Sequence, residues 1–166
     1  MTKSDYPNRT AFLSMIGWSE GTRTSPITKH DGYDVIVTGL DKKPEIFTDF
    51  SDHPFAKGRP PKQINSKGLF SSAAGRYQIM RKDWPHYKAQ LKLPDFSPAS
   101  QDLYAIQLIR ERGALPLIDG GDIELAIARC SNLWASFPGA GYNQPEHQID
   151  RLIVAYVAAG GKLRGK

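Results

Sequence analysis

The sequence predicts an α+β fold: one domain with a small antiparallel sheet lobe, a helical lobe and a cleft between them. An amphipathic segment with helical spacing comes first, short segments rich in β-branched residues follow, and a run of helical segments completes the chain. Separate runs of strands and helices are typical of α+β folds. A chain of 166 residues fits one such domain, here residues 1–166.

The first predicted helix spans Asn8 to Gly21 and ends in an acid. Phe12, Ile16 and Glu20 lie four residues apart, so they share one helical face, which is apolar until its last turn. Asn8 is a favourable N-cap, and Gly21 suits the left-handed position that follows many helices. We therefore expect Glu20 at the C-terminus of the helix, on its inward side.

This placement makes Glu20 a candidate general acid. The negative end of the helix dipole and desolvation beside Trp18 would both raise the pKa of its carboxyl group. A general acid must hold its proton near neutral pH. The alternative is a solvated glutamate at a frayed helix end.

The predicted sheet follows. Tyr33 to Gly39 is a strand by its β-branched residues, and Ile46 to Ser51 is the returning strand of a hairpin with a long connection. The segment from Asp52 to Ser72 contains prolines, glycines and lysines, which predicts a flexible loop. Ala73 to Met80 supplies a third short strand.

The rest of the chain is predicted to be helical. Pro85 falls in the first turn of one helix, and Ser97 is the N-cap of a stronger one. Asp122 is the expected N-cap of a helix that buries Cys130. The predicted segments are Arg81 to Leu91, Ser97 to Gly113, a single turn from Ala114 to Gly121, Asp122 to Phe137, and Pro145 to Gly160.

Composition restricts the partners. The net charge is +5 and the pI about 9.3, which favours a polyanionic partner such as nucleic acid or a bacterial wall. The basic residues are scattered and form no helical stripe, so nucleic acid is not expected. No apolar run approaches the ~20 residues of a membrane helix, and the N-terminus lacks the features of a signal peptide, so neither membrane insertion nor a leader is expected.

Metal and nucleophile motifs are absent from the sequence. The four histidines are far apart without an HExxH pattern, and the single cysteine, Cys130, lies on an apolar helix face. The sequence PGAGYN lacks the Lys-Ser/Thr of a phosphate loop. We expect no metal and no cofactor. Glycoside hydrolysis normally uses two carboxylates, and the candidate partners of Glu20 are Asp31, Asp34, Asp49 and Asp52.

Asp34 is the most interesting of these, because it lies in the strand predicted to face the cleft. The alternative is a structural acid that accepts a hydrogen bond from a loop amide. The residues alone leave both roles open.

Several blocks give the chain a family resemblance. They include WSEG around Glu20, GYDVIV around Asp34, FTDFSDHP, AGRYQ, ERGALP, CSN and PGAGY. The chain resembles the lambda-type phage endolysins, which are lytic transglycosylases, over nearly its whole length and in order. The main departure is the loop from Lys57 to Ser71, which leaves the details of the cleft edge open.

The resemblance implies a lysozyme-like fold and a catalytic acid, Glu20, that acts without a second essential carboxylate. Other phage lysozymes have an aspartate nine residues after the catalytic glutamate, where this chain has Lys29. By the same resemblance, the residues expected to contact glycan are Asp34, Arg76, Gln78, Ser131, Asn132 and Tyr142.

The predicted function is therefore that of an endolysin, acting as a monomer on peptidoglycan glycan strands. It would cleave the β-1,4 bond between N-acetylmuramic acid and N-acetylglucosamine and form a 1,6-anhydro sugar. One rival is a hydrolysing muramidase with Asp34 as second carboxylate, and another is a non-catalytic wall-binding module. The resemblance also implies that the protein stays in the host cytoplasm until a separate hole-forming protein releases it to the wall.

Overall fold

The structure is a computed structural model that describes residues 6–142 and 145–165. These residues form six α-helices and four short strands, and they divide into two compact units. The first unit contains the residues up to Glu20 and from Ala105 onward, and the second is Gly21–Tyr104. The elements in chain order are α1 (Pro7–Ser19), β1 (Val35–Ile36), β2 (Glu45–Ile46), β3 (Lys62–Gln63), β4 (Phe70–Ser71), α2 (Trp84–Gln90), α3 (Pro98–Glu111), α4 (Leu115–Gly120), α5 (Ile123–Arg129) and α6 (Ile149–Ala158).

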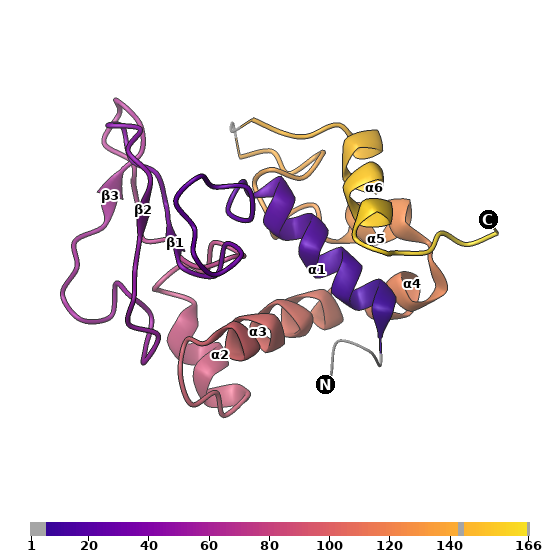
Figure 1. Ribbon diagram of the computed structural model, residues 1–166, viewed down its shortest axis with the longest axis horizontal. Helices are drawn as coiled ribbons and strands as arrows, with labels where there is room; N and C mark the ends of the chain where they lie inside the picture. The colour runs from indigo at the N-terminus through magenta and orange to yellow at the C-terminus, as the bar shows by residue number, and fades with distance from the viewer. Residues whose placement is uncertain (1–5, 143–144, 166) are drawn as a thin grey trace. The chain divides into compact units, whose positions relative to one another are not determined.

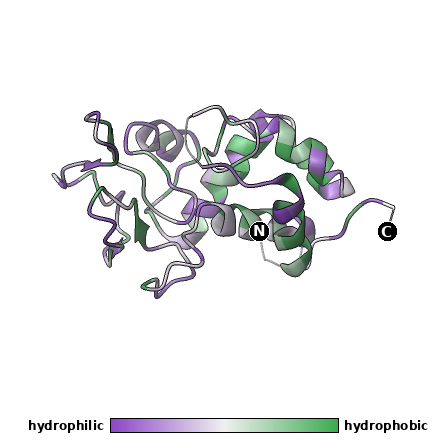
Figure 2. Ribbon diagram, turned by 90° about the horizontal axis from the view of Figure 1, so that it is seen from above, coloured by the Kyte–Doolittle hydropathy of each residue, from purple (hydrophilic) through white to green (hydrophobic). Residues whose placement is uncertain are grey.

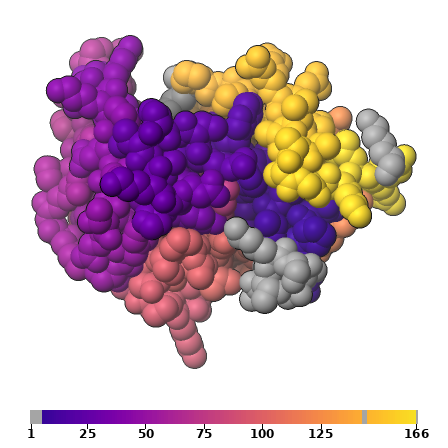
Figure 3. Space-filling view, in the orientation of Figure 1, coloured from indigo at the N-terminus to yellow at the C-terminus, as the bar shows by residue number. Residues whose placement is uncertain are grey.

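Helix α1 is the centre of the first unit. It packs against α6 and α4, and α5 lies against both α4 and α6 (Figure 1). In the space-filling view the residues of α6 (yellow) lie at the surface beside those of α1 (indigo; Figure 3). The predicted apolar face of α1 is confirmed, because Phe12, Met15 and Ile16 are fully buried.

The other helices of this unit bury one side each, as their amphipathic spacing requires. Coloured by hydropathy, they carry both apolar and polar bands (Figure 2). Cys130 is fully buried, as its position on an apolar helix face predicts. Trp134 and Phe137 pack on each other, with ring centroids 5.3 Å apart, and Phe137 meets Phe12 of α1 edge to face at 6.5 Å.

The second unit contains the predicted hairpin, but its strands are much shorter than expected. β1 and β2 pair antiparallel with Val35 opposite Ile46. The predicted third strand is reduced to isolated bridges, in which Ala74 pairs with both Ile36 and Ile79. The segment predicted as a loop contains a second antiparallel hairpin, β3–β4, with Lys62 opposite Ser71. Asn65 explains that hairpin, because its side chain accepts hydrogen bonds from the amides of Lys67 and Leu69 across the turn.

The structure confirms one predicted N-cap, Ser97, and contradicts another, Asn8. Ser97 does cap α3, since its hydroxyl oxygen accepts the Ser100 amide at 3.3 Å. Asn8 is not an N-cap: α1 begins after Tyr6, and the Asn8 side chain instead donates to the carbonyl of Ile118 and accepts the amide of Lys162. Asn8 therefore ties two other segments of the first unit to α1.

Two C-terminal helices are shorter than predicted. α5 ends at Arg129 instead of Phe137, and the residues that follow form turns. Those turns allow Trp134 and Phe137 to reach the core, a tertiary gain that outweighs the helical spacing of the sequence. α6 begins at Ile149 rather than Pro145, and Gln148 before it has extended backbone.

Among the described residues, no helix is both long and apolar enough to span a membrane.

Candidate active site

Glu20 occupies the C-cap of α1, as predicted. Its amide donates to the carbonyl of Ile16 at 2.8 Å, and Gly21 follows with a φ of +72°, a left-handed conformation that glycine adopts without steric cost. The chain therefore leaves the helix directly after the acid. The carboxyl group lies where the helix dipole disfavours a negative charge.

The surroundings of Glu20 raise its pKa to about 7, from an ordinary value of 4.5, and the main cause is desolvation by burial. Hydrogen bonds from Ser136 act in the opposite direction, because they stabilise the carboxylate. The Ser136 hydroxyl donates to Glu20 Oε1 at 2.8 Å. With a pKa near 7 the group is partly protonated at neutral pH and can both donate and recover a proton.

Further contacts hold Ser136, the hydrogen-bond donor to Glu20, in place. The hydroxyl oxygens of Ser19 and Ser136 are 2.7 Å apart. His147 contacts the backbone of both serines: its amide donates to the Ser136 carbonyl at 2.8 Å, and its Nε2 lies 3.0 Å from the Ser19 carbonyl. The imidazole also packs on the indole of Trp18, with ring centroids 4.7 Å apart.

Sequence reasoning missed both Ser136 and His147. Ser136 lies in the apolar run LWASF, and a polar residue inside such a run was the available signal. His147 was considered only as a metal ligand and set aside. Neither residue has a spacing from Glu20 that a local pattern would reveal, since more than a hundred positions separate them in the chain.

Three of the predicted glycan-contact residues lie together in the first unit. The Tyr142 hydroxyl donates to the Asn132 carbonyl at 2.7 Å, and Ser131 directly precedes Asn132. Asn132 and Tyr142 are both exposed, and Arg112 donates to the Asn132 side chain at 3.1 Å. An aromatic ring beside exposed amide and hydroxyl groups suits a sugar, which offers C–H faces and hydroxyl edges.

The glycine-rich turn before Tyr142 is held by one acid. Glu146 accepts the amide of Gly139 at 2.9 Å and that of Gly141 at 3.3 Å. Both glycines have positive φ, which places their amides in position to converge on the carboxylate.

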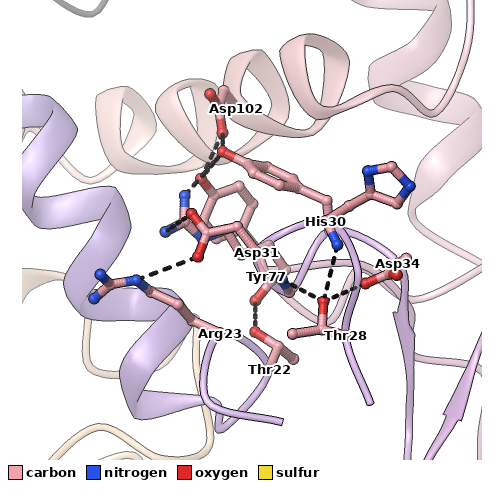
Figure 4. Close-up of polar contacts among 11 residues, drawn as sticks. Thr22, Arg23, Thr28, His30, Asp31, Asp34, Tyr77 and Asp102 are labelled. Atoms are coloured by element: carbon pink, nitrogen blue, oxygen red, sulfur yellow. Dashed lines mark hydrogen bonds and ion pairs between the residues drawn. The ribbon is translucent and has the colours of Figure 1, made fainter. Parts of the chain in front are cut away.

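The other three predicted residues lie in the second unit, and Asp34 there is fully buried. Its carboxylate accepts a hydrogen bond from the hydroxyl of Thr28 (Figure 4) and, at 2.9 Å, one from the amide of Lys29. The Thr28 oxygen in turn accepts the Gly32 amide at 2.8 Å. Asp34 thus holds the loop that precedes β1, which is the structural role left open by the sequence.

Arg76 is also buried, and it belongs to a cluster of polar groups. Its guanidinium donates to the Tyr33 hydroxyl at 2.9 Å and lies 3.4 Å from the carboxylate of Asp31, which is itself exposed. Tyr33 and Tyr77 both donate to Asp102. Burial raises the pKa of Tyr33 to about 12, so its hydroxyl stays protonated and remains a donor.

Gln78 lies in the turn between the two bridged residues of the same unit, with a φ of +51°. Its side-chain amide donates to the Gly75 carbonyl at 3.1 Å, and the residue is half-buried. The structure therefore brings together Ser131, Asn132 and Tyr142 in one unit, and Asp34, Arg76 and Gln78 in the other. Within the parts of the chain that the structure describes, no group of histidine, cysteine, aspartate or glutamate side chains forms a metal site.

A helix-terminal glutamate with a raised pKa, in a chain with one helical unit and a second unit that contains short antiparallel hairpins together with α2, defines a lysozyme-like protein. Comparison with solved structures agrees. Bacteriophage lambda lysozyme complexed with a chitohexasaccharide matches with a TM-score of 0.87 and 53% identity, covering 99% of this chain and 100% of that one. A second structure of lysozyme from bacteriophage lambda matches with a TM-score of 0.83 and 51% identity.

Sequence comparison then gives the family. The endolysin family model matches residues 10–163. The endolysin of Escherichia phage P2 is 62% identical over 156 residues, and that of Escherichia phage lambda is 55% identical over 157 residues. These alignments cover 94% of this chain and at least 93% of either relative. The chain belongs to the endolysin family, and it is a peptidoglycan-cleaving phage enzyme with the lysozyme-like fold that the sequence predicted.

Proposed function

We propose that this endolysin is a lytic transglycosylase that cleaves the β-1,4 bond between N-acetylmuramic acid and N-acetylglucosamine and releases a 1,6-anhydro product. The observation that carries the proposal is the contrast between two carboxyl groups. Desolvation raises the pKa of Glu20 despite the hydrogen bonds from Ser136, whereas the two oxygens of Asp34 accept hydrogen bonds from Thr28 and Lys29 of the loop before β1.

The reaction begins with a proton. Protonated Glu20 gives its proton to the glycosidic oxygen, the bond from that oxygen to the anomeric carbon breaks, and positive charge develops on the muramic acid ring. The 6-hydroxyl of the same sugar then attacks the anomeric carbon and passes its proton to the Glu20 carboxylate. Glu20 ends in its starting state, and no water is consumed.

One carboxyl group is enough for this sequence because the substrate supplies the nucleophile. The 6-hydroxyl is attached to the reacting ring, so its attack is intramolecular and loses little translational freedom. A hydrolysing muramidase would instead need a base to activate water. Asp34 is poorly suited to that task, because its side chain has no exposed surface and its donors are backbone and hydroxyl groups of its own loop.

The glycan would be held by the exposed groups of Asn132 and Tyr142, with Ser131 beside them. Asp34 and Arg76 are buried, so any effect of theirs on binding would pass through the loop segments that they hold. We further propose that the protein acts as a monomer and reaches the wall from the host cytoplasm through a separate hole-forming protein.

Mass spectrometry of digested wall tests the mechanism. Purified sacculi are incubated with the enzyme, and the released muropeptides are compared with those from a hydrolysing lysozyme. We expect muropeptides that are one water lighter, and a reducing-sugar assay that stays flat while turbidity falls. Ordinary reducing muramic acid ends would contradict the proposal and favour the muramidase alternative.

A further inference from the structure

Counting the protons on the two serine hydroxyl groups shows that Ser136 is the donor to Glu20 and Ser19 the donor to Ser136. A serine hydroxyl carries one proton and can give it to one acceptor. Ser136 gives it to Glu20 Oε1 at 2.8 Å. The 2.7 Å contact between the two serine oxygens must then use the proton of Ser19, so Ser19 donates to Ser136 and Ser136 donates to Glu20. The two serines form a directed chain that ends on one oxygen of the acid.

Ser19 and Ser136, whose hydroxyl groups form this hydrogen-bond chain, are held in place through their backbone. Ser19 is the last residue of α1 and is 4% exposed, so water competes little for its hydroxyl. His147 contacts the carbonyl of Ser19 through Nε2 and the carbonyl of Ser136 through its amide. The hydroxyl chain therefore joins two segments that His147 also joins.

We propose that Ser136 is a positioning residue for the acid: its hydroxyl, oriented by Ser19, keeps Glu20 Oε1 as an acceptor, so that Oε2 carries the transferable proton. This inference rests on the proposed role of Glu20 as the acid. An acid whose proton can lie on either oxygen presents it to the glycosidic oxygen only part of the time. With Oε1 occupied, the proton is presented from one defined atom.

The effect on proton affinity has a definite sign. The hydrogen bonds from Ser136 stabilise the carboxylate and lower the pKa of Glu20, against the desolvation that raises it. Removing the hydroxyl should therefore raise the pKa further. Glu20 would then be a weaker acid in the first step, and its proton would no longer be directed to one oxygen.

The experiment measures the titration of Glu20 directly. Protein with ¹³C-labelled glutamate carboxyl groups is titrated by NMR, and the Glu20 signal is assigned by its loss in Glu20→Gln. The variants are Ser136→Ala, Ser136→Thr and Ser19→Ala. Ser14→Ala is the matched control, a serine-to-alanine change in the same helix and away from the acid. Initial rates of muropeptide release are recorded across the same pH range.

We expect Ser136→Ala to raise the Glu20 midpoint by about one pH unit, since a hydrogen bond to a charged group corresponds to that order of shift. The basic limb of the rate profile should move up with it, and the maximal rate should fall roughly tenfold. Ser136→Thr keeps a hydroxyl and should restore the midpoint. Ser19→Ala should shift the midpoint upward by less, and Ser14→Ala should leave both readouts unchanged.

A purely structural role of Ser136 would lower the melting temperature without moving the Glu20 midpoint. Unchanged midpoints in Ser136→Ala and Ser19→Ala, with folded protein by circular dichroism, would overturn the proposal. If Ser136→Ala does not fold, the Ser19→Ala titration decides by the same criterion. An active Glu20→Gln variant would refute the role of Glu20 as the acid, and this outcome is separate, because the NMR titration does not depend on activity.

Discussion

Two carboxyl groups, one in each compact unit, show how surroundings turn the same chemical group to different uses. Glu20 ends a helix, is desolvated, and receives one side-chain hydrogen bond, from Ser136. Asp34 is more deeply buried, yet the Thr28 hydroxyl and the Lys29 amide satisfy both of its oxygens. At Glu20 the effect of desolvation on the pKa exceeds that of the hydrogen bonds from Ser136, which leaves a proton available for chemistry, whereas the hydrogen bonds to Asp34 fix a loop.

The contrast extends to the units themselves. The first unit is ordered by apolar helix faces, which bury Phe12, Ile16 and Phe137 completely. The second has strands of two residues each, so side chains replace much of the missing ladder. Gln101 is fully buried there and serves three backbone groups, donating to the carbonyls of Tyr33 and Phe96 and accepting the Arg76 amide.

The largest expected effect is a loss of lytic activity, and it distinguishes Glu20 from Asp34. Glu20→Gln keeps the shape of the side chain but cannot give up and recover a proton, so lysis should fall by at least about a thousandfold. Turbidity clearing of permeabilised cells measures the loss, and circular dichroism should be unchanged. Wild-type clearing by a folded variant would show that Glu20 is not the acid.

The second prediction concerns stability, for which a substitution of Asp34 should have a larger effect than one of Glu20. Asp34→Ala leaves the Thr28 hydroxyl and the Lys29 amide without their acceptor, which should cost roughly 2–4 kcal/mol of unfolding free energy. Asp34→Asn retains one acceptor oxygen and should cost less. Chemical denaturation measures both variants, and a loss of activity from either without a loss of stability would return Asp34 to the role of second carboxylate.

The helical unit was the part of the fold that sequence predicted best, because its apolar residues recur with a local period. The position of Glu20 at a helix end follows from Phe12, Ile16 and Gly21 alone. The failures came where distant contacts outweighed local spacing. Asn8 looks like an N-cap but binds the backbone of Ile118 and Lys162, and α5 stops early so that Trp134 and Phe137 can enter the core.

In the second unit, periodicity had little to detect, since strands of two residues contain no alternation. The β3–β4 hairpin was missed because its prolines and glycines suggested a flexible loop, while the turn depends on one residue, Asn65. In the site, Ser136 and His147 were not predicted, because their positions beside Glu20 depend on the tertiary fold. Only a wide search for polar residues within apolar runs would have proposed Ser136.

A third prediction tests the packing of the apolar core in the first unit. Cys130 is fully buried, and burial raises the pKa of its thiol to about 12, so it remains neutral and unreactive at neutral pH. Cys130→Ser places a hydroxyl in that environment and should cost roughly 1–3 kcal/mol if the hydroxyl finds no partner. Activity per folded molecule should not change. Lost activity with an intact melting curve would place the thiol in the chemistry.

A fourth prediction follows from the raised pKa of Glu20. The folded chain holds this proton with a pKa of about 7, against an ordinary 4.5, so between these values the folded state binds more protons than the unfolded state. Unfolding free energy therefore decreases as pH rises through this window. Glu20→Gln lacks the ionisation and should be more stable than wild type above pH 7 by about 1–2 kcal/mol, after allowance for partial exposure, and no more stable below the ordinary value.

Melting curves of both proteins at acidic and mildly alkaline pH measure this difference. An equal difference at both ends of the range would show that the ionisation of Glu20 is not its source.

The smallest expected effect lies at the β3–β4 hairpin, where charge pairs rather than buried groups make the connection. Glu45 of β2 forms ion pairs with Arg59 and, at 2.6 Å, with Lys62 of β3, and the hydrogen bond from Lys62 lowers the pKa of Glu45. These side chains are partly exposed, so removing both pairs with Glu45→Gln should cost less than about 1 kcal/mol of unfolding free energy.

The depressed pKa of Glu45 means that this contribution to stability is present above the ordinary pKa and is lost as pH falls through the pKa of the folded state. Trypsin at neutral pH should therefore nick the variant faster than wild type at Lys67 in the exposed turn, and high-salt buffer should reduce the difference. Asp41→Asn, in the connection between β1 and β2, is the matched control, and equal nicking of all three proteins would show that the hairpin is held without Glu45.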